Sequence, residues 1–206
     1  MRRGLSWLLC GGALVLSGCA SGGSSAQEPA TSAEPGTGME SEAETESATE
    51  GQAGAERATV ALQPTEGHQT SGQLQIEVDG DGVRVTGTVE GLTPGGKHGF
   101  HIHAVGDCSA PDASSAGPHY TVGEEPHGHP GHGEHHLGDM KNLEADDTGR
   151  ATVDQKVAGA TLGGGSPGDI LGKAVVVHQA EDDYATQPAG ASGARIACGV
   201  IQPAQG

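Results

Sequence analysis

Short segments in which apolar and polar residues alternate recur through residues 57–201. Ala58, Val60 and Leu62 alternate with polar residues, and Leu74 and Ile76 do the same in the next segment. A period of two places the apolar side chains on one face of a strand, whereas helical periodicity is about 3.6 residues. Because no segment has a persuasive helical repeat, the pattern predicts strands over 57–63, 73–78, 83–89, 97–103, 140–145, 150–157, 172–178 and 194–201.

Glycine-rich turns separate several of these expected strands. Asp79–Gly82 and Asp146–Gly149 each stand between two strands and are typical of hairpin turns. With one Trp, two Tyr and one Phe in 206 residues, the core must rest on Val, Ile, Leu and Ala. Many short strands with such turns predict an all-β fold, an eight-stranded antiparallel sandwich or barrel. Two long loops interrupt it, 104–138 and 179–193, and loops of this length are usually functional.

The first nineteen residues have the pattern of an export signal. Met1–Arg3 is positively charged, and Leu5–Leu16 is an apolar run too short to span a bilayer. The small residues before Cys19 resemble the lipobox of bacterial lipoproteins, in which the chain is cut before the cysteine and the cysteine is lipidated. We therefore expect a signal peptide over 1–18 and a lipid on Cys19. The alternative is an ordinary signal peptide with a chance cysteine near its cleavage site.

A polar, acidic segment follows over residues 19–56. Between residues 20 and 56 it holds eight Glu and no Lys or Arg, and it has no apolar periodicity. Such a composition predicts a disordered tether, because it offers too little apolar surface to fold. The whole chain carries 10 Lys and Arg against 27 Asp and Glu, a net charge of −17. This charge excludes nucleic-acid binding through phosphate contacts. The folded domain is expected over 57–206.

The expected domain contains two cysteines, Cys108 and Cys198. An exported chain meets an oxidising compartment, where two remaining cysteines pair more often than they stay free. We therefore expect a disulfide, with two unpaired thiols as the alternative.

Histidines are concentrated in the middle of the domain. His101 and His103 stand two apart on an expected strand, so their rings share one face. His178 ends another apolar strand. This placement favours a metal site assembled from several elements over two alternatives, isolated surface histidines or a loose metal-scavenging tract. The loop between them carries His119, His127, His129, His132, His135, His136 and Asp139.

Four motifs, in this order, resemble signatures of the copper/zinc superoxide dismutases. They are Gly99–Cys108, Ser115–His119, His136–Asp139 and Gly193–Ile201. The resemblance spans the whole expected domain and, with the lipobox, points to the bacterial lipoprotein type. It implies a Greek-key β-barrel whose two long loops carry the site.

The resemblance also implies a site with two metals. Copper ligands would be His101, His103, His119 and His178. Zinc ligands would be His119, His127, His136 and Asp139, so that His119 bridges the two ions. His127 is chosen because it lies eight residues after His119 and nine before His136, as the family pattern has it.

Other residues match the family's supporting roles. Arg195 matches an arginine that guides the superoxide anion, and with His119 it would be catalytic. Asp182 matches an aspartate that links the two metal sites, and His98 a buried structural histidine. Cys108 and Cys198 match the family's disulfide. His129, His132 and His135 are left over and are expected to be solvated.

The implied activity is conversion of superoxide to oxygen and hydrogen peroxide by cycling copper between Cu(II) and Cu(I). The alternative is a non-enzymatic copper- and zinc-binding envelope lipoprotein on the same fold. A third hypothesis is an interaction protein whose histidine-rich loop is incidental. The expected location is the bacterial cell envelope, on the extracytoplasmic side of a membrane, in the periplasm or at the cell surface. Family members are monomers or homodimers, and the loop 179–193 lacks the lysines that steer substrate in animal relatives.

Overall fold

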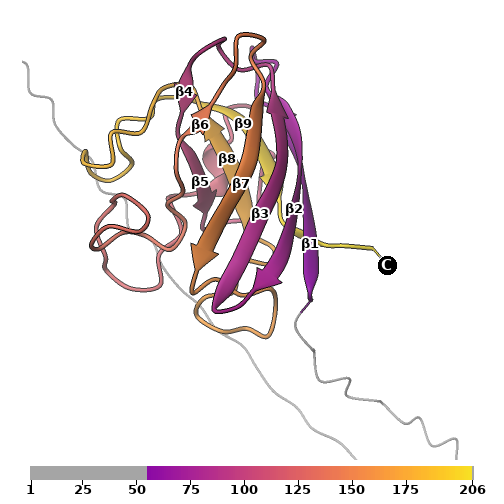
Figure 1. Ribbon diagram of the computed structural model, residues 1–206, viewed down its shortest axis with the longest axis vertical. Coiled ribbons are helices and arrows are strands. Elements are labelled where there is room, and N and C mark those ends of the chain that lie inside the picture. The colour runs from indigo at the N-terminus through magenta and orange to yellow at the C-terminus, as the bar shows by residue number, and fades with distance from the viewer. Residues whose placement is uncertain (1–54, 206) are drawn as a thin grey trace, which may run out of the picture. The chain divides into compact units, whose positions relative to one another are not determined.

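The computed structural model describes residues 55–205, which form ten strands and one short 3-10 helix (Figure 1). The expected signal peptide, Cys19 and almost all of the expected tether lie outside the described residues. No helix within residues 55–205 is long and apolar enough to cross a membrane. The strands are β1 Arg57–Pro64, β2 Ser71–Asp79, β3 Gly82–Glu90, β4 Lys97–His98, β5 Phe100–His103, β6 Leu143–Glu144, β7 Ala151–Ala158, β8 Ala174–His178, β9 Arg195–Val200 and β10 Gln202–Pro203, and the helix η1 is Ser114–Ala116.

Eight of the ten strands in the described residues form one curled antiparallel sheet (Figure 1). Its order is β5-β8-β9-β1-β2-β3-β7, with β10 paired to β1 and a separate short pair β4-β6. Strands β3 and β7 are neighbours although β4, β5 and β6 come between them in the chain, so long connections link the hairpins in the manner of a Greek key. The expected all-β antiparallel fold is confirmed.

The core is filled by the aliphatic side chains that the alternation assigned to one face. Val60, Leu62 and Ile76 are fully buried, and Phe100 is the one buried aromatic among the described core residues. At Gly87 the inward-facing position of β3 carries no side chain, and the backbone has φ +146°. A Cβ there would lie 2.2 Å from the Gln73 carbonyl oxygen, so the close pairing of β2 and β3 requires glycine.

Three expected strands differ from the structure. The segment 97–103 is broken at Gly99, so that β4 pairs with β6 and β5 pairs with β8. Gly99 instead bonds to the second long loop, its N–H donating to the Ala180 carbonyl at 2.8 Å. A Cβ on Gly99 would lie 2.7 Å from that of Ser192, so the missing side chain admits the loop. The segment 140–145 retains only β6, and β10 extends the expected strand 194–201 after a break.

Cys108 and Cys198 are joined by a disulfide, as expected, with a Cα–Cα distance of 5.8 Å. Cys198 lies in β9, and Cys108 lies in the first long loop, which runs on from β5. The bond therefore fixes the beginning of this loop to the middle of the sheet.

Replacing both cysteines with alanine should lower the unfolding free energy. The bond closes a loop with a sequence separation of 90, and the chain-entropy model gives about 4–5 kcal/mol for such a loop as an upper figure. Chemical denaturation with and without reductant measures the effect. The wild type should lose stability in reductant and the double variant should not; equal stability of all four samples would contradict a structural disulfide.

Candidate metal centre

Two strands bring three of the predicted ligands together. His101 and His103 lie on β5, and His178 is the last residue of β8, which pairs with β5. All three rings are buried. A register shift between Val177 and His178 ends the regular ladder, and the His178 N–H donates to the Gly99 carbonyl at 2.8 Å. The break at Gly99 therefore also positions this histidine.

The first long loop returns twice to the free edge of β5. Tyr120 N–H donates to the Ile102 carbonyl, and Ile102 N–H donates to the Gly138 carbonyl, both at 2.8 Å. These contacts place His119 opposite His103 and Asp139 opposite His101. Gly138 has to be glycine, because a Cβ there would lie 2.2 Å from the Ile102 carbonyl oxygen. The backbone of the loop thus delivers two more predicted ligands to the strand that carries the first two.

One group of possible ligands consists only of histidines, and we call it the four-histidine cluster. Its ring nitrogens lie within 4.8 Å of one another. His103 Nδ1 donates to the Gly117 carbonyl at 2.8 Å, and His178 Nδ1 to the Gly193 carbonyl at 3.2 Å. The proton of each ring is thus on Nδ1, and the lone pairs of the two Nε2 atoms face each other at 3.3 Å. Among the described residues, His101 Nδ1 and His119 Nε2 are buried and have no hydrogen-bond partner. Each ring therefore offers one lone pair to a cation. The members are His101, His103, His119 and His178.

A second group of possible ligands surrounds one carboxylate oxygen, and we call it the histidine–aspartate cluster. Asp139 Oδ1 lies 2.9 Å from Nδ1 of His119 and of His127, and 3.4 Å from Nδ1 of His136. The other oxygen, Oδ2, accepts from the N–H groups of Gly128 and His136. Three nitrogens and one carboxylate oxygen suit a closed four-coordinate site. The members are His119, His127, His136 and Asp139.

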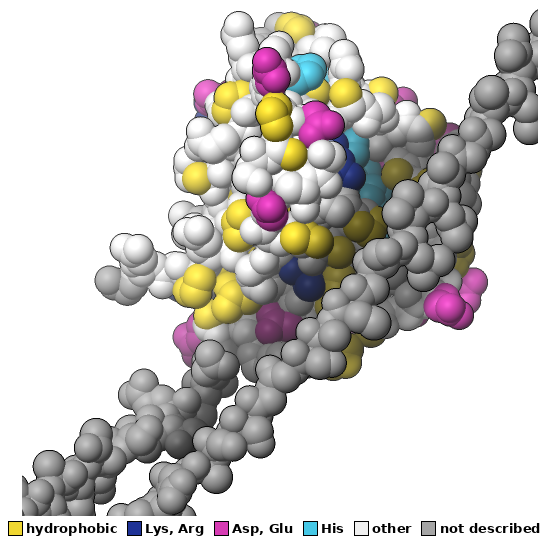
Figure 2. Space-filling view, turned by 180° about the vertical axis from the view of Figure 1, so that it is seen from behind, with side chains coloured by type: hydrophobic (Ala, Val, Ile, Leu, Met, Phe, Trp, Pro, Cys, Tyr) yellow, Lys and Arg dark blue, Asp and Glu magenta, His cyan; other side chains and the backbone are white. Residues whose placement is uncertain are grey.

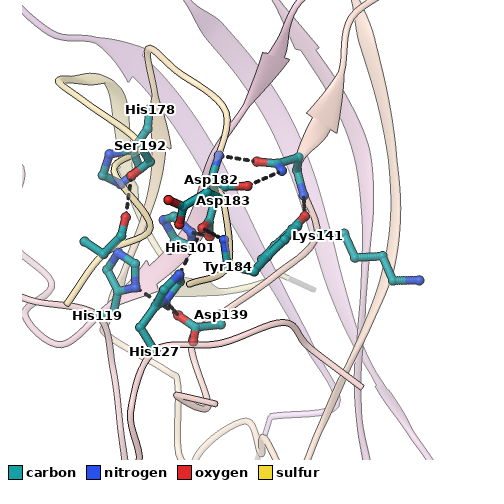
Figure 3. A network of polar contacts seen from close by, with 12 residues as sticks. His101, His119, His127, Asp139, Lys141, His178, Asp182, Asp183, Tyr184 and Ser192 are labelled. Carbon is teal, nitrogen blue, oxygen red and sulfur yellow. Dashed lines mark hydrogen bonds and ion pairs between the residues drawn. The ribbon is translucent and has the colours of Figure 1, made fainter. Parts of the chain in front are cut away.

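Asp182 joins the two clusters, as Figure 3 shows. One carboxylate oxygen lies 2.7 Å from His101 Nε2 and the other lies 2.9 Å from His127 Nε2. Asp182 itself is held by Asn142, whose side-chain amide donates to the Asp182 carbonyl and accepts from its N–H. His98 is buried, as expected, and its Nδ1 donates to the His178 carbonyl at 2.9 Å.

Burial keeps three rings of the four-histidine cluster neutral. It lowers the pKa of His101 to about 4, of His103 to about 2 and of His178 to about 3, since a charged ring there loses its hydration. Burial acts the same way on His127, but hydrogen bonds to Asp139 and Asp182 outweigh it and raise the pKa of His127 to about 9. Burial would raise the pKa of the two carboxyls, but hydrogen bonds outweigh it and hold each pKa well below its usual range. These bonds come from His119 and His127 at Asp139, and from His101 and His127 at Asp182.

Arg195, at the start of β9, is tied to the same backbone as the cluster. Its guanidinium donates to the Ala113 and Gly117 carbonyls, both at 2.6 Å. The Gly117 oxygen is also the acceptor for His103 Nδ1. Arg195 is half-buried and lines a surface hollow with Thr65, His68 and Asp112. On the face pictured in Figure 2, basic side chains lie next to exposed histidine.

Sequence reasoning left out several residues that shape the site. The Gly117 and Gly193 carbonyls fix two ring tautomers, and Asn142 fixes Asp182. Backbone acceptors carry no sequence signal, so only the structure reveals them. The expectation that His129 and His135 are solvated is wrong, because both are half-buried, whereas His132 is exposed as expected. The His129 ring packs on Tyr184 with a centroid distance of 4.5 Å.

The metal-free protein should be most stable near pH 6.5. The pKa values of His101, His103 and His178 lie below the usual 6.5, so the unfolded chain takes up protons first and stability falls as the pH drops below 6.5. This costs at most about 2 kcal/mol per ring at pH 5. The raised pKa of His127 stabilises the folded protein below pH 6.5, and this stabilisation is lost as the pH rises through 9. Denaturant midpoints of the metal-free protein between pH 5 and 9 measure this; a flat profile would be inconsistent with it.

Asp182→Ala should weaken metal retention in both clusters. It removes the acceptor for His101 and His127, and loss of such orienting partners lowers metal affinity by about 10- to 100-fold. Competition with a chelator, followed by metal analysis, measures the change. Asp183→Ala is the matched control, because Asp183 is exposed and its carboxylate bonds only to Ala185 and Thr186 among the described residues. Equal metal loss in the two variants would count against a linking role for Asp182.

Known proteins resemble this chain in sequence and in fold. The chain is 38% identical over 128 residues to the superoxide dismutase-like protein YojM of Bacillus subtilis (strain 168), covering 61% of this chain and 65% of that protein. It is 40% identical over 141 residues to the Cu-Zn superoxide dismutase 2 of Mesembryanthemum crystallinum, covering 65% and 88%. A double mutant of a SOD-like protein from Bacillus subtilis matches with a TM-score of 0.63 at 37% identity, covering 70% of this chain and 96% of that one. The clock protein EA4 matches with a TM-score of 0.65 at 34% identity, covering 73% and 96%.

The family model for copper/zinc superoxide dismutase matches residues 70–201. This range runs from the loop before β2 to the end of β9 and includes both clusters, the disulfide and Arg195. The chain therefore belongs to the copper/zinc superoxide dismutase family.

Proposed function

We propose that this protein is an active superoxide dismutase that uses copper in the four-histidine cluster and zinc in the histidine–aspartate cluster. The observation that carries the proposal is His119, whose Nδ1 faces Asp139 and whose Nε2 is a buried atom without a partner in the other cluster. A single ring facing two ligand sets is suited to lie between two cations. Neither a simple metal store nor an incidental histidine tract requires that arrangement.

The chemistry of the two donor sets supports different metals. Four imidazoles suit copper in both of its oxidation states, and three imidazoles with a carboxylate suit zinc. When bound, copper supplies one-electron redox chemistry and zinc supplies a fixed positive charge. Burial lowers the pKa of His101, His103 and His178, so these rings are neutral near pH 7 and would bind a metal without first losing a proton.

The chain's own groups would perform the remaining tasks. Arg195 would attract and dock the superoxide anion, because its charge is partly desolvated and held in place by two carbonyls. His119 would carry a proton at Nε2 and release it toward the reduced substrate only when that nitrogen is not a metal ligand, and Asp139 would orient the ring from the Nδ1 side. Two superoxide anions and two protons thereby give one oxygen and one hydrogen peroxide.

A non-enzymatic copper- and zinc-binding lipoprotein is the competing function. It is favoured by the relative from Bacillus subtilis that is called only superoxide dismutase-like. Against it stands Arg195, a fixed positive charge tied to the backbone that orients His103 but belonging to neither ligand group, because a cation beside a metal site suits an anionic substrate better than metal storage. Metal analysis together with a dismutation assay on the purified protein separates the two functions, because a store would bind both metals without turnover.

Arg195→Ala should leave copper and zinc content unchanged and slow dismutation. Losing an ion-pair energy of about 1–2 kcal/mol in a partly screened site corresponds to a fall of roughly 5- to 30-fold. Arg195→Glu should be slower still, and added salt should relieve part of its defect because salt screens the repulsion. Rates measured against ionic strength, with metal content checked, test this.

Arg84→Ala is the matched control for these variants. Arg84 is exposed on β3 and pairs with Asp79 and Asp154, outside both clusters. Its loss should leave the rate unchanged. If Arg195→Ala and Arg195→Glu bind full metal and turn over at the wild-type rate, substrate guidance by Arg195 is wrong.

We also propose that the protein is anchored by a lipid on Cys19 to the extracytoplasmic side of a bacterial membrane, in the periplasm or at the cell surface. The support is the lipobox-like sequence before Cys19 and the polar segment after it. Cys19→Ser should move the protein from the membrane fraction to the soluble fraction without loss of activity. A variant that still sediments with membranes would refute the anchor.

A further inference from the structure

A tight turn lies at the outer end of the first long loop. It comprises His129, Pro130, Gly131 and His132. The N–H of His132 donates to the His129 carbonyl at 3.0 Å, and Gly131 has φ +90°. Proline at the second position and a glycine with positive φ at the third are the requirements of a type II turn. The local sequence therefore brings the first and fourth residues, both histidines, side by side.

The two rings are arranged like rings within the four-histidine cluster. The centroids of His129 and His132 are 4.8 Å apart at an interplanar angle of 57°. For comparison, His101 and His178 are 4.9 Å apart at 65°, and His103 and His119 are 5.0 Å apart at 67°. Neither His129 nor His132 belongs to the two clusters described above.

One of the two rings is held before any ligand arrives. The His129 ring packs edge-on against Tyr184, and the Tyr184 hydroxyl accepts from the Asn142 N–H at 2.7 Å. The Nδ1 atom of His129 is buried and has no hydrogen-bond partner among the described residues. A buried nitrogen without a partner costs free energy, which a bound cation would recover. His132 is exposed, so an ion can reach the pair from solvent.

We propose that His129 and His132 form a third metal site, which takes copper(II) as its preferred ion. Imidazole ligands suit copper, nickel and zinc, and copper(II) binds tightest among the divalent ions of this series. The net charge of −17 raises the local concentration of any cation. Two protein ligands leave the remaining positions to water, so this site binds more weakly than the buried clusters. It does not depend on dismutase activity.

His135 provides a matched control on the same loop. It is also a histidine outside both clusters, and it lines a hollow with Pro130 and Gly131 of the turn and with Leu137 and Val157. Within residues 55–205 its ring forms no ring pair with His129 or His132, which pair with each other. A loose scavenging tract would use all three histidines alike, whereas a built pair would use two.

The test is copper(II) binding to protein whose buried clusters already hold copper and zinc. Equilibrium dialysis against copper(II) alone should show one additional ion, with an electron paramagnetic resonance signal split by nitrogen. His132→Ala should weaken this binding by about 100-fold or more, because the second ligand no longer acts from the same molecule. His129→Ala should do the same, and His135→Ala should bind like the wild type.

Copper and zinc content of each variant shows that the buried clusters remain intact. His132 is the decisive position if His129→Ala disturbs the neighbouring ligand His127. The proposal is overturned if the wild type binds no additional copper(II). It is also overturned if His132→Ala retains the additional ion, or if His135→Ala loses it equally.

Discussion

The candidate metal centre depends on two buried carboxylates that contact most of its imidazole rings. Asp139 and Asp182 lie among six buried or nearly buried imidazoles, and each contacts more than one ring. An isolated carboxylate in such surroundings would be very costly to bury, and so would an unpaired imidazolium. Paired, they orient the rings of His101, His119 and His127. The Gly117 and Gly193 carbonyls do the same for His103 and His178.

The sheet supplies the rigid part of this arrangement and the loops supply the rest. Strand β5 is short, yet both of its edges are occupied, one by β8 and the other by the middle and the last part of the first long loop. Gly99 and Gly138 permit these close approaches, since neither position has room for a side chain. The candidate ligands therefore lie next to backbone–backbone hydrogen bonds between β5 and its neighbours, and these bonds limit how far the ligands can move.

Much of the fold could be predicted from the alternation of Val, Leu and Ile, because half-buried strands leave a direct sequence pattern. The break at Gly99 could not, since it depends on a loop 80 residues away that packs against it. The ligand residues could be predicted from motifs, and the structure brings all seven into two groups. Their tautomers could not, because the acceptors at Gly117 and Gly193 are carbonyls that every residue possesses. The packing of His129 on Tyr184 likewise joins two loops that are separate in sequence.

The Gly117 carbonyl helps to fix the position of the Arg195 guanidinium beside the four-histidine cluster. It accepts from His103 and from Arg195, and Arg195 spans to a second carbonyl at Ala113. A planar guanidinium can make such a forked contact and a lysine ammonium cannot reproduce it. The Arg195 side chain therefore loses its rotational freedom when the protein folds, and not when an anion binds. Under the proposed function, a diatomic substrate, which has very few atoms with which to offset ordering of the protein, would meet a charge that is already in place.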